Sequence, residues 1–273
     1  MNTILILARL TFREALRRKI VLAAVIMAIA FLVIYSLGFH FMRQEMVRER
    51  MLLQGLNFMQ LAGMYVVNFL VIATAALITA DSLAGEIQSG TIQAVATKPV
   101  RRIEIVLGKW LGNAGLLLLY LLLLGGGMVL IVWLISRMET FNWVIGLLLI
   151  YFNGLVILSL TLAFSSSLST LATGGAVFGA FGLAFMGGWV ERIGTVIQNQ
   201  TAVNLGIFTS LLLPSEALWN KAAAQMSSPL IGLVSVTPFT AASEPSTLMI
   251  IYAGLYLLAA LGAAVWRFAR RDL

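Results

Sequence analysis

Residues 81–110 read DSLAGEIQSGTIQAVATKPVRRIEIVLGKW, a charged segment with glycines and a proline between two long apolar runs. Each flanking run is long enough to cross a bilayer, since about 20 apolar residues span about 30 Å of hydrocarbon. The segment therefore connects two membrane spans and lies outside the lipid. A short polar insert of this kind favours the docking of a partner over catalysis by this chain.

Composition places the whole chain in the membrane class. It has 273 residues, of which 60% are hydrophobic and 11% are charged, and the mean hydropathy is +0.98. Soluble domains contain about 25% charged residues. There is no cysteine and one histidine, His40, so disulfides, thiolate sites and multi-histidine metal sites are excluded. Met42 and Met46 lie near His40, but this set is too small for a copper site, and we expect no metal.

Six apolar segments have the length of a membrane-spanning helix. The expected fold is therefore all-α, a polytopic membrane protein with six transmembrane helices in a single domain over 1–273. A seventh apolar run, 203–213, is too short to cross and stops at Pro214, so we expect it to be re-entrant or interfacial. The six predicted spans are 20–39, 60–80, 111–136, 143–164, 171–190 and 247–266.

The distribution of basic residues predicts the orientation. With the N-terminus in the cytoplasm, six spans return the C-terminus to the same side. Twelve of the 18 lysines and arginines then lie inside and six outside, while the acidic residues divide almost evenly. This bias accounts for the net charge of +7, so no nucleic-acid partner is needed. We expect a multi-pass cell-membrane protein with both termini cytoplasmic.

Residues 1–19 are predicted to form an amphipathic elbow helix. Its arginines recur every four residues on one face, and Glu14 is placed to pair with Arg18. A basic helix of this kind lies among lipid headgroups. Two interpretations stay open, a topology anchor and an elbow that also touches a cytoplasmic partner. The predicted membrane-anchor residues are Arg9, Arg13, Arg17 and Arg18.

The connecting segment 81–109 divides into short parts. Asp81 ends the second span in this interpretation, and a turn follows at residues 85–91. Residues 91–97 are long enough for about two helical turns before Pro99 stops them. Arg101 and Lys109 are then the basic anchors at the return to the bilayer. The result is a coupling helix parallel to the membrane.

The spacing of these residues resembles a known signature. The order Gly85-Glu86, three residues, Gly90-Thr91, seven residues, Pro99, Arg101, six residues and Gly108-Lys109 is similar to that of the type-two ABC exporter permeases. The branch with the nitrous-oxide-reductase maturation permease looks closest. Span number, basic N-terminal helix and cytoplasmic termini agree with this resemblance over essentially the whole chain.

The resemblance implies a function and partners. It implies a membrane-spanning permease subunit of an ATP-driven exporter, paired with a second permease copy, most simply as a homodimer. The chain has no phosphate-binding GxxxxGK[ST] motif, so a separate ABC ATPase subunit would hold the ATP and magnesium, and this chain needs no cofactor. The localisation implied is a prokaryotic plasma membrane. The implied ATPase-coupling residues are Gly85, Glu86, Gly90, Thr91, Pro99, Arg101, Gly108 and Lys109.

Two features of the spans have a structural and a functional interpretation. The fifth span contains Gly175, Gly179 and Gly182, which suit either packing within the chain or a surface at a dimer axis. Asn68 in the second span suits either a bond between helices or the transport pathway. No acidic or basic residue lies near the centre of a predicted span, which argues against an ion-coupled carrier.

Residues 191–246 form the longest predicted outer segment, interpreted as a gate region or as a loop that caps the bundle. Ser215 is expected to cap a short helix with Glu216 in its first turn. Three further functions are alternatives: a subunit that transmits force without moving a substrate, an ATP-independent channel or carrier, and an intramembrane enzyme. The last is excluded because the sequence has no nucleophile paired with a base and no HExxH motif.

Overall fold

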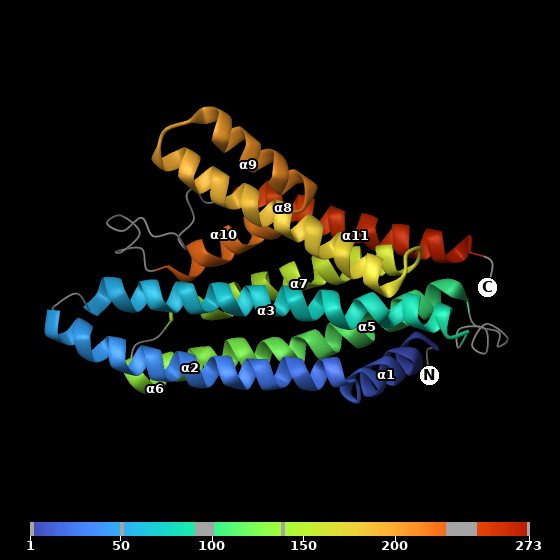
Figure 1. Cartoon of the computed structure of the whole chain (residues 1–273), viewed down its shortest axis with the longest axis horizontal. Coiled ribbons are helices and arrows are strands. Elements are labelled where there is room, and N and C mark those ends of the chain that lie inside the picture. Colours follow the sequence, from blue (N-terminus) through green and yellow to red (C-terminus); the bar gives the residue numbers. More distant parts are fainter. Residues whose placement is uncertain (1–2, 50–51, 91–100, 138–139, 228–244, 272–273) are drawn as a thin grey trace.

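The chain forms a bundle of long helices that carries both termini at one end (Figure 1). This computed structural model describes residues 3–49, 52–90, 101–137, 140–227 and 245–271, and every regular element in them is helical. The helices are α1 (Thr3–Leu16), α2 (Lys19–Glu49), α3 (Leu52–Gln88), α5 (Arg102–Leu121), the π-helix η1 (Leu122–Gly126), α6 (Gly127–Ser136), α7 (Trp143–Ser165), α8 (Thr170–Val196), α9 (Gln200–Leu212), α10 (Ser215–Met226) and α11 (Thr247–Ala269).

The six predicted spans are confirmed as helices, and most of them are longer than predicted. Among the described residues, six helical segments are long and apolar enough to cross a membrane. The second of them continues to Gln88, eight residues beyond its predicted end, and the fifth continues to Val196. Charged residues end an apolar run but not a helix, since the i→i−4 hydrogen bonds join backbone groups and do not require apolar side chains. The third span is continuous from α5 through η1 to α6.

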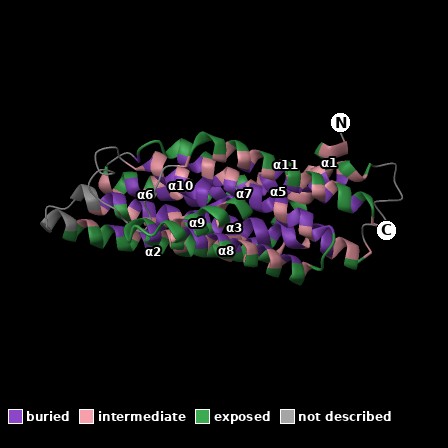
Figure 2. Cartoon of the chain, turned by 90° about the horizontal axis from the view of Figure 1, so that it is seen from above, coloured by how far each residue is buried: buried purple, intermediate pink, exposed green. Residues whose placement is uncertain are grey.

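Helices α3 and α7 form the centre of the bundle. In each of them, 67% of the most apolar window is buried, against 22% in α2 and 11% in α11, which face outward. Buried residues lie along the axis of the bundle and exposed ones on its flanks (Figure 2). Exposed leucines and isoleucines on α2, α8 and α11 are lipid-facing surface in a protein of this class.

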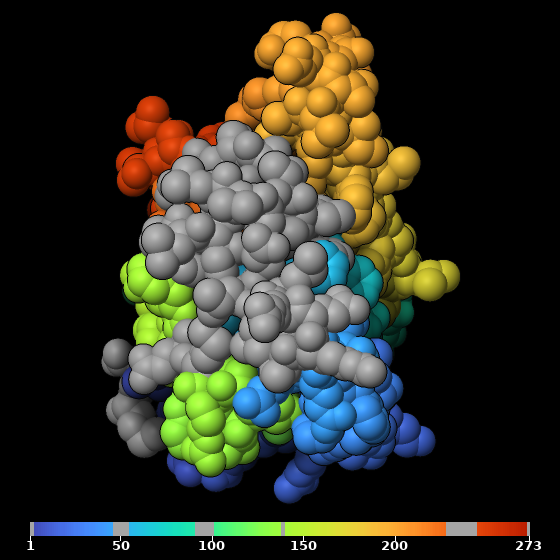
Figure 3. Space-filling view, turned by 90° about the vertical axis from the view of Figure 1, so that its left-hand side faces the viewer, coloured from blue at the N-terminus to red at the C-terminus, as the bar shows by residue number. Residues whose placement is uncertain are grey.

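The region after the fifth span is a bent helix pair rather than an open loop. Helices α9 and α10 meet at 104° across Pro214, which gives a broken span or a re-entrant loop. Helix α9 folds back along α8, where Gly187, Gly194 and Gly206 allow close approach. The α8–α9 hairpin projects from the rest of the molecule (Figure 3), whereas α10 lies against α7. The short apolar run 203–213 thus lies largely in α9, which ends at Leu212, and its predicted failure to cross the membrane stays a prediction.

Candidate functional site: a polar junction at the end that carries both termini

The polar junction joins α1, the C-terminal turns of α3, the first turns of α5 and the end of α11. It flanks residues 91–100, which lie outside the described residues, so the predicted coupling helix with Thr91 and Pro99 stays a prediction. Gly90, just before that segment, has φ +71°, a left-handed conformation that favours glycine at the end of a helix.

The predicted turn at residues 85–91 begins later than expected. Helix α3 continues through Gly85 and Glu86 to Gln88, so these two residues lie inside a helix and form no docking turn. A side chain at position 85 would collide with the carboxylate of Asp81, one helical turn earlier. Gly85 therefore leaves room for that carboxylate to bind its partners.

Asp81 and Arg18 tie the N-terminal helices to α3. Arg18 Nη1 donates to Asp81 Oδ2 at 2.8 Å and Nη2 donates to Glu14 Oε1 at 2.6 Å, which confirms the predicted Glu14 pair. Thr170 Oγ1, at the start of α8, donates to the other Asp81 oxygen at 3.1 Å. Burial opposes the charged form of Arg18, but its acidic neighbours Glu14, Asp81 and Glu86 raise its pKa overall. Arg18 is therefore half-buried in an ion-pair network and is no free lipid anchor, in contrast to its prediction.

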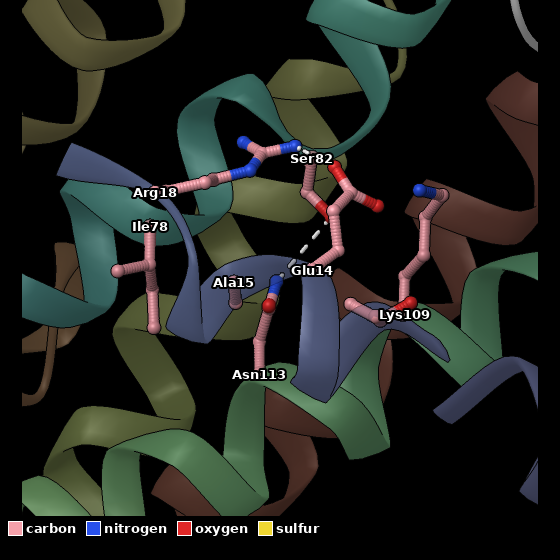
Figure 4. Close-up of a pocket in the computed structure, with 8 residues that line it drawn as sticks. Glu14, Ala15, Arg18, Ile78, Ser82, Lys109 and Asn113 are labelled. Atoms are coloured by element: carbon pink, nitrogen blue, oxygen red, sulfur yellow. Dashed lines mark hydrogen bonds and ion pairs between the residues drawn. The ribbon is translucent and has the colours of Figure 1, made fainter. Parts of the chain in front are cut away.

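Lys109 is also a protein contact and no lipid anchor. Its ammonium forms a short ion pair with Glu86, and the two side chains are 8% and 18% exposed. One helical turn further along α5, Asn113 Nδ2 donates to Ser82 Oγ at 3.3 Å. Arg18, Ser82, Lys109 and Asn113 line a small pocket between α1, α3 and α5, together with Thr11, Glu14, Ala15 and Ile78 (Figure 4). The pocket joins three helices by charge and hydrogen bonding.

Two glycines of α5, Gly108 and Gly112, let α1 pack closely against the α5 backbone. A Cβ on Gly108 would lie 2.5 Å from the Cβ of Leu7, and one on Gly112 would lie 2.7 Å from the carbonyl oxygen of Ala8. The less polar face of α1 thus touches the α5 backbone, while Arg9, Arg13 and Arg17 are exposed on the other side. Gly108 contributes to this helix contact, and its predicted place at the return to the bilayer stays a prediction.

We expect Gly112→Ala to loosen α1 and to lower the free energy of unfolding by about 1–3 kcal/mol, because the new methyl overlaps backbone that has no rotamer to change. Gly115→Ala is the matched control, since a Cβ there meets only Phe12, at 3.6 Å. The measurement is SDS titration of the detergent-solubilised protein. Equal stability of both variants would show that α1 is not seated on Gly112.

The end of α11 is fastened to the start of α5. Arg102 Nη1 donates to the carbonyl oxygens of Phe268, Ala269 and Arg271 at 2.6–3.2 Å, an arrangement that satisfies the free carbonyls at the end of a helix. Arg101, the residue before it, has an exposed side chain, and its backbone N–H donates to Glu104 Oε2 at 3.0 Å. The first residue of α5 thus connects the edge of segment 91–100 to the last span.

The structure also contains a buried polar cluster between α3, α7, α8 and α10 that the sequence analysis missed. Arg192 Nη2 donates to Glu216 Oε2 at 2.9 Å and to Asn220 Oδ1 at 3.0 Å, and both charged side chains are under 10% exposed. The sequence places Arg192 and Glu216 in the outer region 191–246, because the apolar run of the fifth span ends at Glu191 and Arg192. The α8 helix continues past them. Arg192 and Glu216 are 24 residues apart, so no short-range pattern in the sequence predicts that they form a pair.

Asn68 belongs to the same cluster. Its Oδ1 accepts a hydrogen bond from Asn153 Nδ2 at 3.0 Å, and Asn153 also donates to the Ser215 carbonyl at 3.1 Å. Ser215 is the first residue of α10 and Pro214 takes the cap position, so the predicted Ser215 cap is wrong. Asn68 therefore connects α3 to α7, and Asn153 connects α7 to Ser215 at the start of α10. We define the buried polar cluster as Tyr65, Asn68, Asn153, Arg192, Ser215, Glu216, Trp219 and Asn220.

The glycines of α8 divide into two groups. A Cβ added to Gly175, Gly179 or Gly182 would meet nothing within 4 Å, so these positions form no close contact within the described part of the chain. Gly187 and Gly188, nearer the end of α8, lie against Thr209 and Glu216. Only the second group serves packing within the chain.

Comparison with protein families gives the identity of the fold. The model of the ABC-2 family transporter protein matches residues 5–273, nearly the whole chain. No curated protein matches the sequence. The described helices agree with a multi-pass membrane subunit, and the absence of a local nucleotide motif in the sequence agrees with the non-catalytic role general in this family. The chain belongs to the ABC-2 family of transporter proteins.

Proposed function

We propose that this protein is the membrane-spanning subunit of an ATP-driven ABC exporter, and that its ATPase partner docks on segment 81–109. Movement of the ATPase then changes the arrangement of the spans and opens them alternately to the two sides. A docked partner shifts such an equilibrium only by its different affinity for the two states. The docking segment must therefore be joined firmly to the spans.

The polar junction is the observation that carries this proposal. Segment 91–100 leaves the bundle from the end of α3 and returns at the start of α5. Both of these ends are fixed: α3 through Asp81 and Glu86, and α5 through Arg102 and Lys109. The contacts of these four residues also reach the α1–α2 turn at Arg18, the start of α8 at Thr170 and the end of α11. A displacement of the segment is therefore passed to most of the bundle at its base.

The open glycines of α8 support a second permease copy. Gly175, Gly179 and Gly182 lie along one helix with no close neighbour among the described residues, and small residues let helices from two chains approach closely in lipid. We infer a homodimer in which α8 of each copy contributes to the interface. The orientation inferred from the basic residues places both termini and segment 81–109 in the cytoplasm.

Mild-detergent capture from the native host tests the assembly. The protein is expressed with two different tags, purified through one of them, and the recovered chains are identified by mass spectrometry. We expect a phosphate-loop ATPase and the second-tagged copy. The variant Gln88→Trp, Arg101→Glu changes exposed residues at the two edges of segment 91–100, so we expect it to reduce ATPase recovery at least about tenfold, corresponding to about 1.4 kcal/mol.

Arg137→Glu is the matched control, because Arg137 is an exposed arginine at the opposite end of the bundle. It should recover as much ATPase as the parent. Glu86→Arg is unsuitable as a docking variant, since it would break the pair with Lys109. Equal recovery by the docking variant would place the docking surface elsewhere, and no ATPase with the intact parent would contradict the ATP-driven mechanism.

A further inference from the structure

The buried polar cluster contains polar atoms that the protein itself does not satisfy. Of the eleven buried side-chain polar atoms without a hydrogen-bond partner in the described part of the chain, five belong to this cluster. They are concentrated in one place between four helices. The five atoms are Asn153 Oδ1, Ser215 Oγ, Trp219 Nε1, and Nε and Nη1 of Arg192.

Asn153 and Arg192 belong to helices that are long and apolar enough to cross a membrane. Asn153 is near the middle of the 23-residue α7, and Arg192 is near the end of α8 that lies away from the termini. An unsatisfied polar group in hydrocarbon costs several kcal/mol of free energy. Five of them together would therefore cost an amount comparable to the whole free energy of unfolding of a domain. Another molecule must supply the missing hydrogen bonds.

The charges and the kinds of atom identify that molecule. Arg192 and Glu216 form a pair whose formal charges cancel, so the cluster calls for no counterion. The unsatisfied atoms include donors (Arg192 and Trp219), an acceptor (Asn153 Oδ1) and a hydroxyl that does both. Nε and Nη1 lie on different edges of the guanidinium, so a single carboxylate cannot bind both of them as a fork. A small neutral molecule with donors and acceptors fits all these atoms.

We propose that the buried polar cluster is a hydrated site, in which bound water connects Asn153, Ser215, Trp219 and Arg192 inside the membrane. Buried waters usually make about three hydrogen bonds to groups that lack protein partners. Arg192 lies four residues before the end of α8, and this end is the side from which water would reach the site. The same atoms can form hydrogen bonds with a neutral polar group of another molecule, such as a hydroxyl or an amide. The surrounding lipid offers no such hydrogen bonds. This inference stands without the ATP-driven mechanism.

Thiol accessibility tests the hydration directly, because the chain has no cysteine of its own. Ser215→Cys changes one atom of an unsatisfied hydroxyl, and Asn220→Cys is a second variant on the same helix. Only the thiolate reacts with methanethiosulfonates, and a thiol in dry apolar surroundings has a raised pKa. A rise of one pKa unit lowers the thiolate fraction, and hence the rate, about tenfold.

Ala222→Cys is the matched control. Ala222 is also on α10 and is fully buried, but it belongs to the apolar core. It lies nearer the far end than Ser215, because Met226 touches Gly146 near the start of α7, whereas Ser215 binds Asn153 at its middle. Depth alone would therefore make Ala222→Cys the faster of the two. Size-exclusion chromatography and thermal unfolding check that each variant is folded.

We expect membrane-impermeant reagents added to vesicles from the far side to modify Ser215→Cys and Asn220→Cys at least about tenfold faster than Ala222→Cys. Cationic and anionic reagents should react at similar rates. If folded Ser215→Cys and Asn220→Cys react as slowly as Ala222→Cys, the cluster is dry and the proposal fails. If anionic reagents are strongly preferred, the site takes an anion and the assignment to a neutral occupant is wrong.

Discussion

Arg192→Met alone is expected to lower the free energy of unfolding by about 3–5 kcal/mol, because it leaves the buried carboxyl of Glu216 without its partner. The Glu216 side chain is 3% exposed, and it keeps only a long contact of 3.4 Å from the hydroxyl of Tyr65. Asn220 loses its bond to the guanidinium as well. SDS titration and the fraction of monodisperse protein after extraction measure the loss.

The double variant Arg192→Met, Glu216→Leu is the control that separates the charge from the packing. Replacement of a buried ion pair by apolar residues of similar volume is often neutral or stabilising, so the double variant should recover most of the lost stability. A double variant as unstable as the single one would show that α10 is held by the shape of these side chains. The result would then contradict the ion pair as the main cause.

Lys109→Met is expected to lower the free energy of unfolding by about 2–3 kcal/mol, less than Arg192→Met. The loss is smaller because Glu86, which remains without its partner, lies at the end of the bundle. Its side chain is 18% exposed and retains some contact with water. We expect a second effect on coupling, because Lys109 joins α5 to α3 at the point where segment 91–100 begins. ATP hydrolysis by the captured complex measures it.

Lys109→Arg distinguishes charge from position. It keeps the positive charge opposite Glu86, so stability should return close to that of the parent. Arginine is longer and planar, and the pair is close to α1, so partial recovery of coupling is the expected outcome. If Lys109→Met unfolds at the same SDS fraction as the parent, the pair with Glu86 does not support the junction.

Much of the fold could be predicted because a membrane span is a property of composition. Long apolar runs must form helices in lipid to satisfy their backbone, so all six spans and the short seventh run were predictable from residue type alone. The ends of the helices were not, since Asp81 and Glu191 end an apolar run while the backbone hydrogen bonds continue beyond them. The error at Asp81 placed Gly85 and Glu86 in a turn, although both lie in α3.

The sequence predicts some residues of the polar junction, among them Arg18, Glu86 and Lys109, but few of their contacts. Glu14 and Arg18 are four residues apart on one helix face, and the spacing alone predicts their pair. Lys109 and Glu86 lie 23 residues apart in the sequence, and they meet because α3 and α5 run side by side. On the same helix, Gly108 and Gly112 face α1. Basic residues near a span end usually anchor to lipid, and this general tendency gave the wrong partner for Lys109.

The sequence by itself determined the class of this protein: a membrane bundle of six helices, of the ABC-2 family, with no nucleotide motif of its own. Those properties depend on the amount and spacing of residue types along the chain. Only the tertiary structure decided which charges meet, because Arg192 and Glu216 become partners through the fold of α8, α9 and α10. The bend of 104° brings α10 back against α7 and α8, and charges that sequence places in a loop become a buried pair inside the membrane.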